Sequence, residues 1–109
     1  MKIEMLLQYA AVKNLKGKDY RVLLYILPRL SFGKFKKISQ REIGEALSMT
    51  KSNVSLAISS LIQNGILEAD PEYRNTKKIR FHGYRENEIA ELIENEVFGD
   101  DELFDCHIW

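Results

Sequence analysis

The chain has 109 residues, of which 45% are hydrophobic and 29% charged, and this length fits one ordinary domain rather than a two-domain enzyme. The single cysteine, Cys106, cannot form an intramolecular disulfide, so nothing indicates a secreted, oxidised scaffold. No apolar run reaches the roughly 18 residues of a membrane span, and the N-terminus lacks the pattern of a signal peptide. A soluble cytoplasmic protein without membrane association is therefore expected.

Charge is distributed unevenly, although the formal net charge is zero. All 16 Lys and Arg residues lie within residues 1–85 together with 7 of the 16 acidic residues, which gives this stretch a formal charge of +9. Residues 86–109 hold the other 9 acids and no Lys or Arg, a charge of −9. The asymmetry predicts a polyanion-binding domain over residues 1–85 and an acidic C-terminal helix and tail over residues 86–109.

The first third of the chain predicts two helices and a very short strand. Residues 1–14 carry a short helical stripe of apolar side chains. After a break, residues 20–30 repeat apolar side chains at the spacing of a buried helix face, and Pro28 should kink or end this helix. Residues 31–33 suit a loop, and residues 35–38 suit a very short strand.

Two short helices separated by a tight turn are predicted next. Ser39 and Glu42 have the spacing of a capping box, in which the hydroxyl accepts from the N3 amide and the carboxylate reaches back to the N-cap amide. A turn follows soon afterwards, and Thr50 supplies the N-cap of a further helix over residues 51–64. Gly65 stands at the left-handed C′ position that would end this helix.

The rest of the chain predicts a hairpin, one more helix and a tail. Residues 66–70 alternate as a strand, residues 71–76 form a polar turn, and residues 77–82 alternate apolar with basic side chains. The hairpin should therefore have one buried and one basic face. Asn87 can cap a last helix over residues 88–98, and the acidic tail that follows shows no periodicity.

This order of helix, short strand, helix, turn, helix and hairpin is that of a winged helix-turn-helix. Residues 43–67, IGEALSMTKSNVSLAISSLIQNGIL, resemble the DNA-binding module of regulators of the multiple-antibiotic-resistance repressor (MarR) type. The stretch that begins LKGKDYRVLLY at residue 15 also resembles the winged-helix region of small plasmid replication proteins of the RepL type. The resemblances imply an α+β winged helix-turn-helix, with a three-helix core, a small antiparallel β-sheet as the wing, and an additional C-terminal helix.

The helix over residues 51–64 is expected to read DNA. A small residue at Gly44 lets the preceding helix approach it, and Val54 fixes it on the core, so its opposite face turns outward. The side chains expected to contact DNA from this helix are Lys51, Ser52, Asn53, Ser55, Leu56 and Ser59. Asn53 is expected to read a base, because an amide pairs bidentately with adenine. The resembled family often has a basic residue where this chain has Leu56, so a thymine-methyl contact or DNA shape would supply specificity there.

Basic side chains outside this helix are expected to bind phosphate. The wing contributes Arg74, Lys77, Lys78 and Arg80 within seven positions, and the entrance to the second helix of the module contributes Lys34, Lys36, Lys37 and Arg41. If ~4 to 6 phosphates are neutralised, log K should fall with log salt at a slope of about −4 to −5. The expected partner is double-stranded DNA.

The C-terminal helix carries a narrow apolar stripe formed by Ile89, Leu92, Ile93 and Val97. A narrow stripe of this kind suits the pairing of two helices, so it predicts a homodimer. Small winged-helix regulators usually dimerise, because two recognition helices placed one DNA turn apart multiply the contact area. Two other roles stay open. The helix could pack on its own domain with a wet acidic face, or the acidic segment could compete with DNA for the basic domain or recruit a basic protein partner.

The sequence shows no pattern typical of catalysis or cofactor binding. Cys106 and His107 alone do not make a tetrahedral metal set, and no catalytic triad, phosphate loop or metalloprotease motif is present. We therefore expect a non-enzymatic protein, without metal or cofactor, that binds specific duplex DNA and regulates transcription. Origin binding in plasmid or mobile-element replication is the alternative. A winged helix that serves only protein interaction is the alternative from another class.

Overall fold

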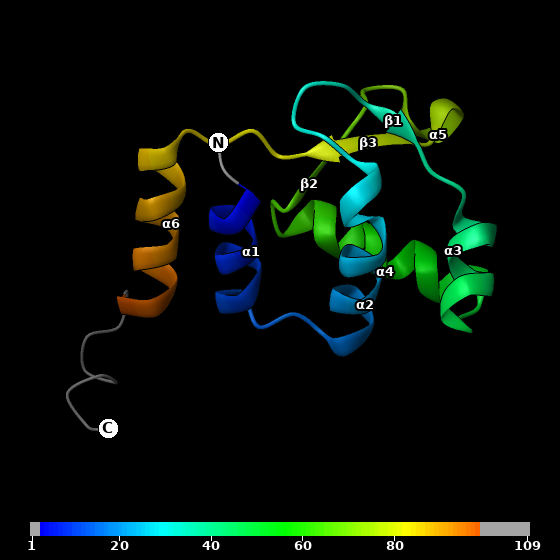
Figure 1. Cartoon of the computed structure of the whole chain (residues 1–109), viewed down its shortest axis with the longest axis horizontal. Helices are drawn as coiled ribbons and strands as arrows, with labels where there is room; N and C mark the ends of the chain where they lie inside the picture. Colours follow the sequence, from blue (N-terminus) through cyan, green and yellow to red (C-terminus); the bar gives the residue numbers. More distant parts are fainter. Residues whose placement is uncertain (1–2, 99–109) are drawn as a thin grey trace. The chain divides into compact units, whose positions relative to one another are not determined.

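The computed structural model describes residues 3–98 and shows an α+β chain in which helices accompany a small antiparallel sheet (Figure 1). The elements are α1 (Ile3–Val12), α2 (Gly17–Ile26), a 3₁₀ turn (Leu27–Arg29), β1 (Lys36–Lys37), α3 (Gln40–Leu47), α4 (Lys51–Gln63), β2 (Leu67–Ala69), α5 (Tyr73–Thr76), β3 (Lys78–Phe81) and α6 (Glu86–Phe98). The expected α+β class is confirmed. The predicted acidic tail, with Cys106 and His107, lies outside the described residues.

The chain divides into two compact units. The central unit is the continuous stretch Leu15–Gly83, and the terminal-helix unit combines Met1–Asn14 with Tyr84–Trp109. The central unit contains thirteen Lys and Arg residues against six Asp and Glu residues. The sequence-based division assigned the first helix to residues 1–85, whereas the structure groups α1 with α6.

Local signals set most of the helix ends in the central unit. The Ser39 hydroxyl accepts a hydrogen bond of 3.1 Å from the backbone N–H of Glu42 at the start of α3, which confirms one half of the predicted capping box. The other half, a bond from the Ser39 N–H to the Glu42 carboxylate, does not form. The Thr50 hydroxyl caps α4 in the same way through the N–H of Asn53, also at 3.1 Å. Gly65 follows α4 with a φ of 78°, the left-handed conformation expected there. The predicted start of the second helix was wrong, because α2 begins at Gly17 rather than at residue 20.

Close backbone packing shapes the corner between α3 and α4. A Cβ atom added at Gly44 would lie 2.6 Å from the carbonyl oxygen of Met49, so this position requires glycine. Ser48 adopts a left-handed φ of 56° between the two helices. Val54, directly after the corner, is fully buried. The predicted roles of Gly44 and Val54 in seating α4 are therefore confirmed.

The three strands form an antiparallel sheet in the order β1-β3-β2. Ile79 and Phe81 of β3 are buried, so this strand turns its apolar side chains inward as predicted. The connection between β2 and β3 was predicted as a polar turn, but it contains the single helical turn α5. The backbone N–H of Lys77 bonds to the carbonyl oxygen of Tyr73 at 2.9 Å, and Lys77 itself is left-handed, with a φ of 54°.

In the terminal-helix unit, α1 and α6 pack together and run in the same direction (Figure 1). The rings of Tyr9 and Tyr84 meet edge to face, 5.8 Å apart. The Lys13 ammonium donates to the Glu96 carboxylate at 2.9 Å. Helix α6 begins at Glu86, two residues earlier than predicted, so Asn87 lies inside the helix rather than at its cap.

Candidate nucleic-acid interface

Helix α4 presents a polar face to solvent. Ser52, Leu56 and Ser59 are exposed, as is Lys51 at the first position of the helix, while Asn53 and Ser55 are half-buried. The opposite face packs into the core through Val54, Ala57, Ile58 and Leu61, which are all buried. The side chains predicted to face outward are thus accessible on one helix. Their contact with DNA stays a prediction.

Leu56 forms a crest between two hollows that flank α4. Its side chain is 68% exposed and borders both of them. The α2-side hollow is lined by residues of α2 and its N-cap and by residues of α4: Lys16, Gly17, Lys18, Asp19, Asn53, Leu56, Ala57 and Ser60. The α3-side hollow is lined by Gln40, Lys51, Ser52 and Ser55, besides Leu56. Of the residues predicted to contact DNA from α4, Asn53 therefore lies on the α2 side, Lys51, Ser52 and Ser55 lie on the α3 side, and Ser59 lines neither hollow.

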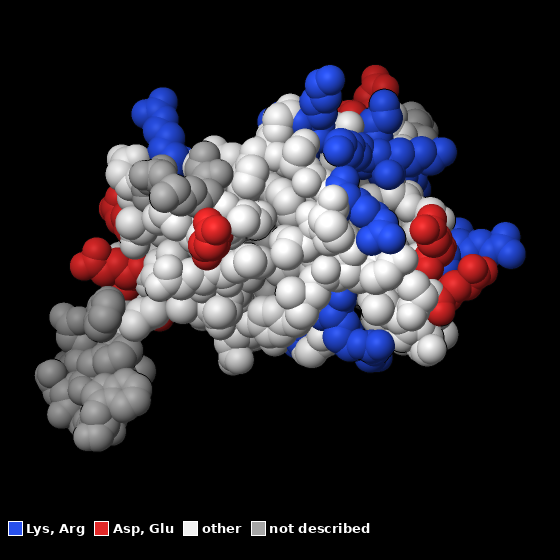
Figure 2. Space-filling model, in the orientation of Figure 1, with Lys and Arg blue, Asp and Glu red and all other residues white. Residues whose placement is uncertain are grey.

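Basic side chains gather over the sheet and α5 (Figure 2). The exposed members of this group are Lys34, Lys36, Lys37, Arg74, Lys77 and Lys78. Lys37 and Lys78 are direct partners in the register of β1 and β3. Like charges directly opposite one another destabilise a sheet. All six were predicted from the sequence to bind phosphate, which stays a prediction.

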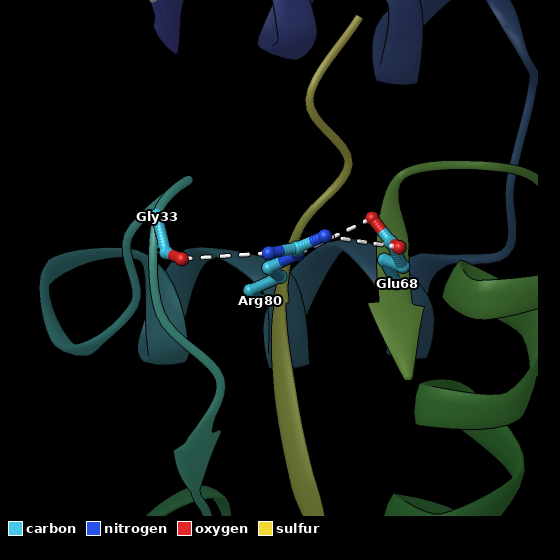
Figure 3. A network of polar contacts seen from close by, with 3 residues as sticks. All are labelled: Gly33, Glu68 and Arg80. Carbon is cyan, nitrogen blue, oxygen red and sulfur yellow. Dashed lines mark hydrogen bonds and ion pairs between the residues drawn. The ribbon is translucent and has the colours of Figure 1, made fainter. Parts of the chain in front are cut away.

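Arg80 differs from the other basic residues of the wing, because its guanidinium is engaged within the protein (Figure 3). Its Nε and Nη2 atoms donate to the two carboxylate oxygens of Glu68 at 3.3 and 3.2 Å, and its Nη1 atom donates to the carbonyl oxygen of Gly33 at 3.4 Å. The guanidinium also lies 4.2 Å from the centre of the Phe35 ring. Arg80 therefore joins β3 to β2 and to the loop before β1, instead of standing free for DNA.

Arg41 lies on α3 and remains accessible. Its Nε atom is 3.2 Å from the Glu45 carboxylate one helical turn away, but both side chains are largely exposed. Such exposed pairs contribute little to stability and exchange readily for another anion. The expected phosphate contact is thus compatible with the position of Arg41.

Two residues of this surface were not anticipated from the sequence. The Nε2 atom of Gln40 donates to the Tyr73 hydroxyl at 3.4 Å, which links the start of α3 to α5 beside the α3-side hollow. The Asp19 carboxylate, only 5% exposed, accepts from the Ser60 hydroxyl at 2.9 Å and thus joins α2 to α4. Neither contact has a local sequence signal, because each depends on how separate helices pack.

The predicted dimerisation stripe of α6 is only partly accessible. Ile89 is fully buried within the chain, so it does not belong to an exposed interface. Leu92, Ile93 and Val97 are half-buried and leave part of their apolar surface open. An interface on α6 is therefore restricted to these last three residues of the stripe.

Within residues 3–98, no helix combines the length and apolar character that crossing a bilayer requires. The same residues contain no group of three or more His, Cys, Asp or Glu side chains placed to hold a metal ion. Comparison with known protein families, curated proteins and solved structures gives no match for this chain.

Proposed function

We propose that the protein is a winged-helix DNA-binding protein that regulates transcription by occupying specific duplex sites, without catalysis. In this proposal α2, α3 and α4 are the three-helix core, α4 is the recognition helix, and the sheet with α5 is the wing. The exposed polar face of α4 is the observation that carries the proposal. It lies in a unit with seven more basic than acidic residues, which suits a polyanionic partner.

The dimensions of α4 support its assignment to the major groove. Its thirteen residues make a helix about 20 Å long, since an α-helix rises ~1.5 Å per residue. With its side chains it is roughly 10–12 Å across, close to the ~12 Å width of the B-DNA major groove. In this proposal Asn53 would read a base, and the hydroxyls of Ser52, Ser55 and Ser59 would contact bases or phosphates.

The wing would bind phosphate through Arg74, Lys77 and Lys78, and β1 and α3 would add Lys36, Lys37 and Arg41. All of these side chains are exposed. Arg80 is assigned instead to holding the wing together, because Glu68 and Gly33 occupy its donors. Phosphate contacts set affinity and register, whereas the residues of α4 set sequence preference.

A homodimer is part of the proposal, with Leu92, Ile93 and Val97 of α6 at its interface. A second copy would cover the half-exposed apolar surface of these side chains and bring two copies of α4 to adjacent half-sites. Sedimentation of the Ile93→Asp variant tests this part separately. A wild-type dimer that becomes a monomer supports the interface, and an unchanged mass contradicts it.

DNA binding is tested first with a random duplex at graded salt concentrations. Binding that weakens with log salt at a slope of about −4 to −5 is expected. Absence of binding at low salt would leave the protein-interaction alternative. Binding-site selection followed by genome-wide mapping then distinguishes regulation from replication, because the bound sites should lie beside promoters rather than at an origin.

The division of labour within the interface has its own test. Asn53→Ala should relax preference at one base pair, with a loss of ~1 to 3 kcal/mol at the preferred sequence. Charge reversal of Lys77 and Lys78 should instead weaken binding to all sequences similarly. Equal patterns of loss in the two variants would contradict the assignment.

A further inference from the structure

The geometry points to a second phosphate-binding surface at the start of α2, where Lys16 and Lys18 would hold the backbone of one DNA strand. This inference rests on the proposed function, since it requires α4 to lie in the major groove. It adds an element that lies outside the helix-turn-helix pair of α3 and α4. The ligand is a phosphodiester of the strand that borders the groove on the α2 side.

The first step concerns the two flanks of α4. Because a helix with its side chains nearly fills the width of the major groove, the two sugar-phosphate backbones must pass along its two sides. Leu56 is the exposed crest of α4, and a hollow lies on each side of it. The protein atoms that line these hollows are therefore the ones that the two backbones would approach.

The second step concerns what each flank offers to a phosphate. The α3-side hollow has Lys51 and the amide of Gln40, and Arg41 follows Gln40 directly on α3. The α2-side hollow has Lys16 and Lys18, both exposed. Within residues 3–98, neither of these two ammonium groups forms an ion pair. Each flank of α4 thus carries lysine side chains that could bind the phosphates of the DNA strand passing on that side.

The third step concerns Asp19, which lines the same α2-side hollow. Its carboxylate is directed into the protein, where it accepts from the Ser60 hydroxyl at 2.9 Å and from the backbone N–H of Lys16 at 3.3 Å. Both bonds go to its Oδ2 atom, and the bond from Ser60 ties the first turn of α2 to α4. Asp19 is therefore a positioning residue that fixes the distance between the two lysines and the recognition helix, and the hollow keeps a surplus of positive charge.

The test is the salt dependence of DNA binding by the Lys16→Gln/Lys18→Gln double variant. Fluorescence anisotropy with a random and a selected duplex should show weaker binding to both. The slope of log K against log salt should be less steep by about 2 for each bound subunit, since each phosphate-bound lysine contributes roughly 1. Arg85→Gln is the matched control: Arg85 is also exposed but lies in the terminal-helix unit, and its removal should leave the slope unchanged.

A wild-type slope in the double variant would overturn the inference, and so would a loss confined to one DNA sequence.

Ethylation interference gives an independent readout. The wild-type protein should be blocked by modified phosphates on both strands, and within each half-site the double variant should lose sensitivity on one strand alone. If the wild-type protein binds no DNA, the proposed function fails. If it binds and responds to charge reversal at Lys77 and Lys78 but not to the double variant, only this inference fails.

Discussion

Lys37 of β1 lies directly across from Lys78 of β3 in the antiparallel register. The neighbouring pair on β3, Arg80 with Glu68 of β2, is compensated by an ion pair of 3.2 Å. The sheet therefore contains one matched and one unmatched cross-strand charge pair, and the unmatched pair lowers the stability of the isolated protein. A phosphate that approaches the two lysines would remove this repulsion.

The first prediction concerns this unmatched pair. Lys78→Glu should raise the free energy of unfolding by ~0.2 to 1 kcal/mol, because an opposite-charge pair replaces a like-charge pair. The same variant should bind duplex DNA more weakly at every salt concentration, with a salt slope reduced by at least about 1. Urea unfolding and fluorescence anisotropy measure the two effects.

Lys37→Glu/Lys78→Glu is the control for that variant. It restores a like-charge pair, so its stability should return toward that of the wild type while DNA binding falls further. A coupling of zero in this double-mutant cycle would contradict a direct interaction between the two side chains. Unchanged DNA binding in Lys78→Glu would contradict the role of the sheet in the interface.

The second prediction concerns the corner between α3 and α4. Gly44→Ala should destabilise the protein by about 1 to 3 kcal/mol, because the new Cβ atom must move the Met49 carbonyl away from 2.6 Å. Chemical denaturation measures the change. Gly17→Ala is the matched control, because beyond its chain neighbours and its own helix backbone no atom lies within 4 Å of the Cβ position there. Similar losses in the two variants would show that close approach is not the cause.

The third prediction separates Arg80 from Arg74. Arg80→Gln should cost about 1 kcal/mol of stability, because Glu68 loses its partner, while the salt slope of DNA binding should not change. Arg74→Gln should leave stability within ~0.5 kcal/mol and make the slope less steep by about 1. The reverse pattern would assign Arg80 to DNA and Arg74 to the fold.

The fourth prediction concerns pH and the pairing of α1 with α6. The hydrogen bond to Glu96 raises the pKa of Lys13 above 10.5, and burial raises the pKa of Tyr84 above 10.0. In both cases the folded state holds the proton more tightly, so the stabilisation is fully present below about pH 10 and is lost as the pH rises through the raised values. The packing of these helices should be constant near neutrality and weaken in alkali.

An absorbance titration of tyrosine ionisation, together with thermal unfolding from pH 8 to pH 12, would measure this effect. Glu96→Gln is the control, because it removes the charged partner of Lys13 and leaves Tyr84 in place. The alkaline loss of stability should become smaller in that variant without disappearing. A wild-type protein whose stability is flat through this range would contradict the prediction.

The sequence predicted those parts of the fold that depend on near neighbours. The caps at Ser39 and Thr50, the end of α4 at Gly65, and the buried face of α4 each follow from residues within about one or two helical turns. α5 was missed because a single helical turn has no periodicity. Hydrogen bonds to residues outside α5 hold this turn, such as the bond from the Tyr73 N–H to the Asp70 carbonyl oxygen.

The sequence predicted the outward face of α4, but it did not predict the engagement of Arg80 or the hollow on the α2 side. The helical spacing of Ser52, Leu56 and Ser59 suffices to place them on one side of a helix that buries Val54. The engagement of Arg80 depends on the register of β2 with β3, which the length of the α5 connection sets. The α2-side hollow depends on how α2 packs against α4, a contact between residues about 40 positions apart, as in the bond of Ser60 to Asp19.

The terminal-helix unit draws its two helices from opposite ends of the chain, whereas the central unit is one continuous segment. During ribosomal synthesis, the central unit is translated before α6, the helix that pairs with α1. At ~5 to 20 residues per second, α1 waits on the order of several seconds for α6 to be translated. Translation therefore completes the central unit first, and pairing of α1 with α6, together with any subunit assembly that depends on α6, can only follow the synthesis of α6.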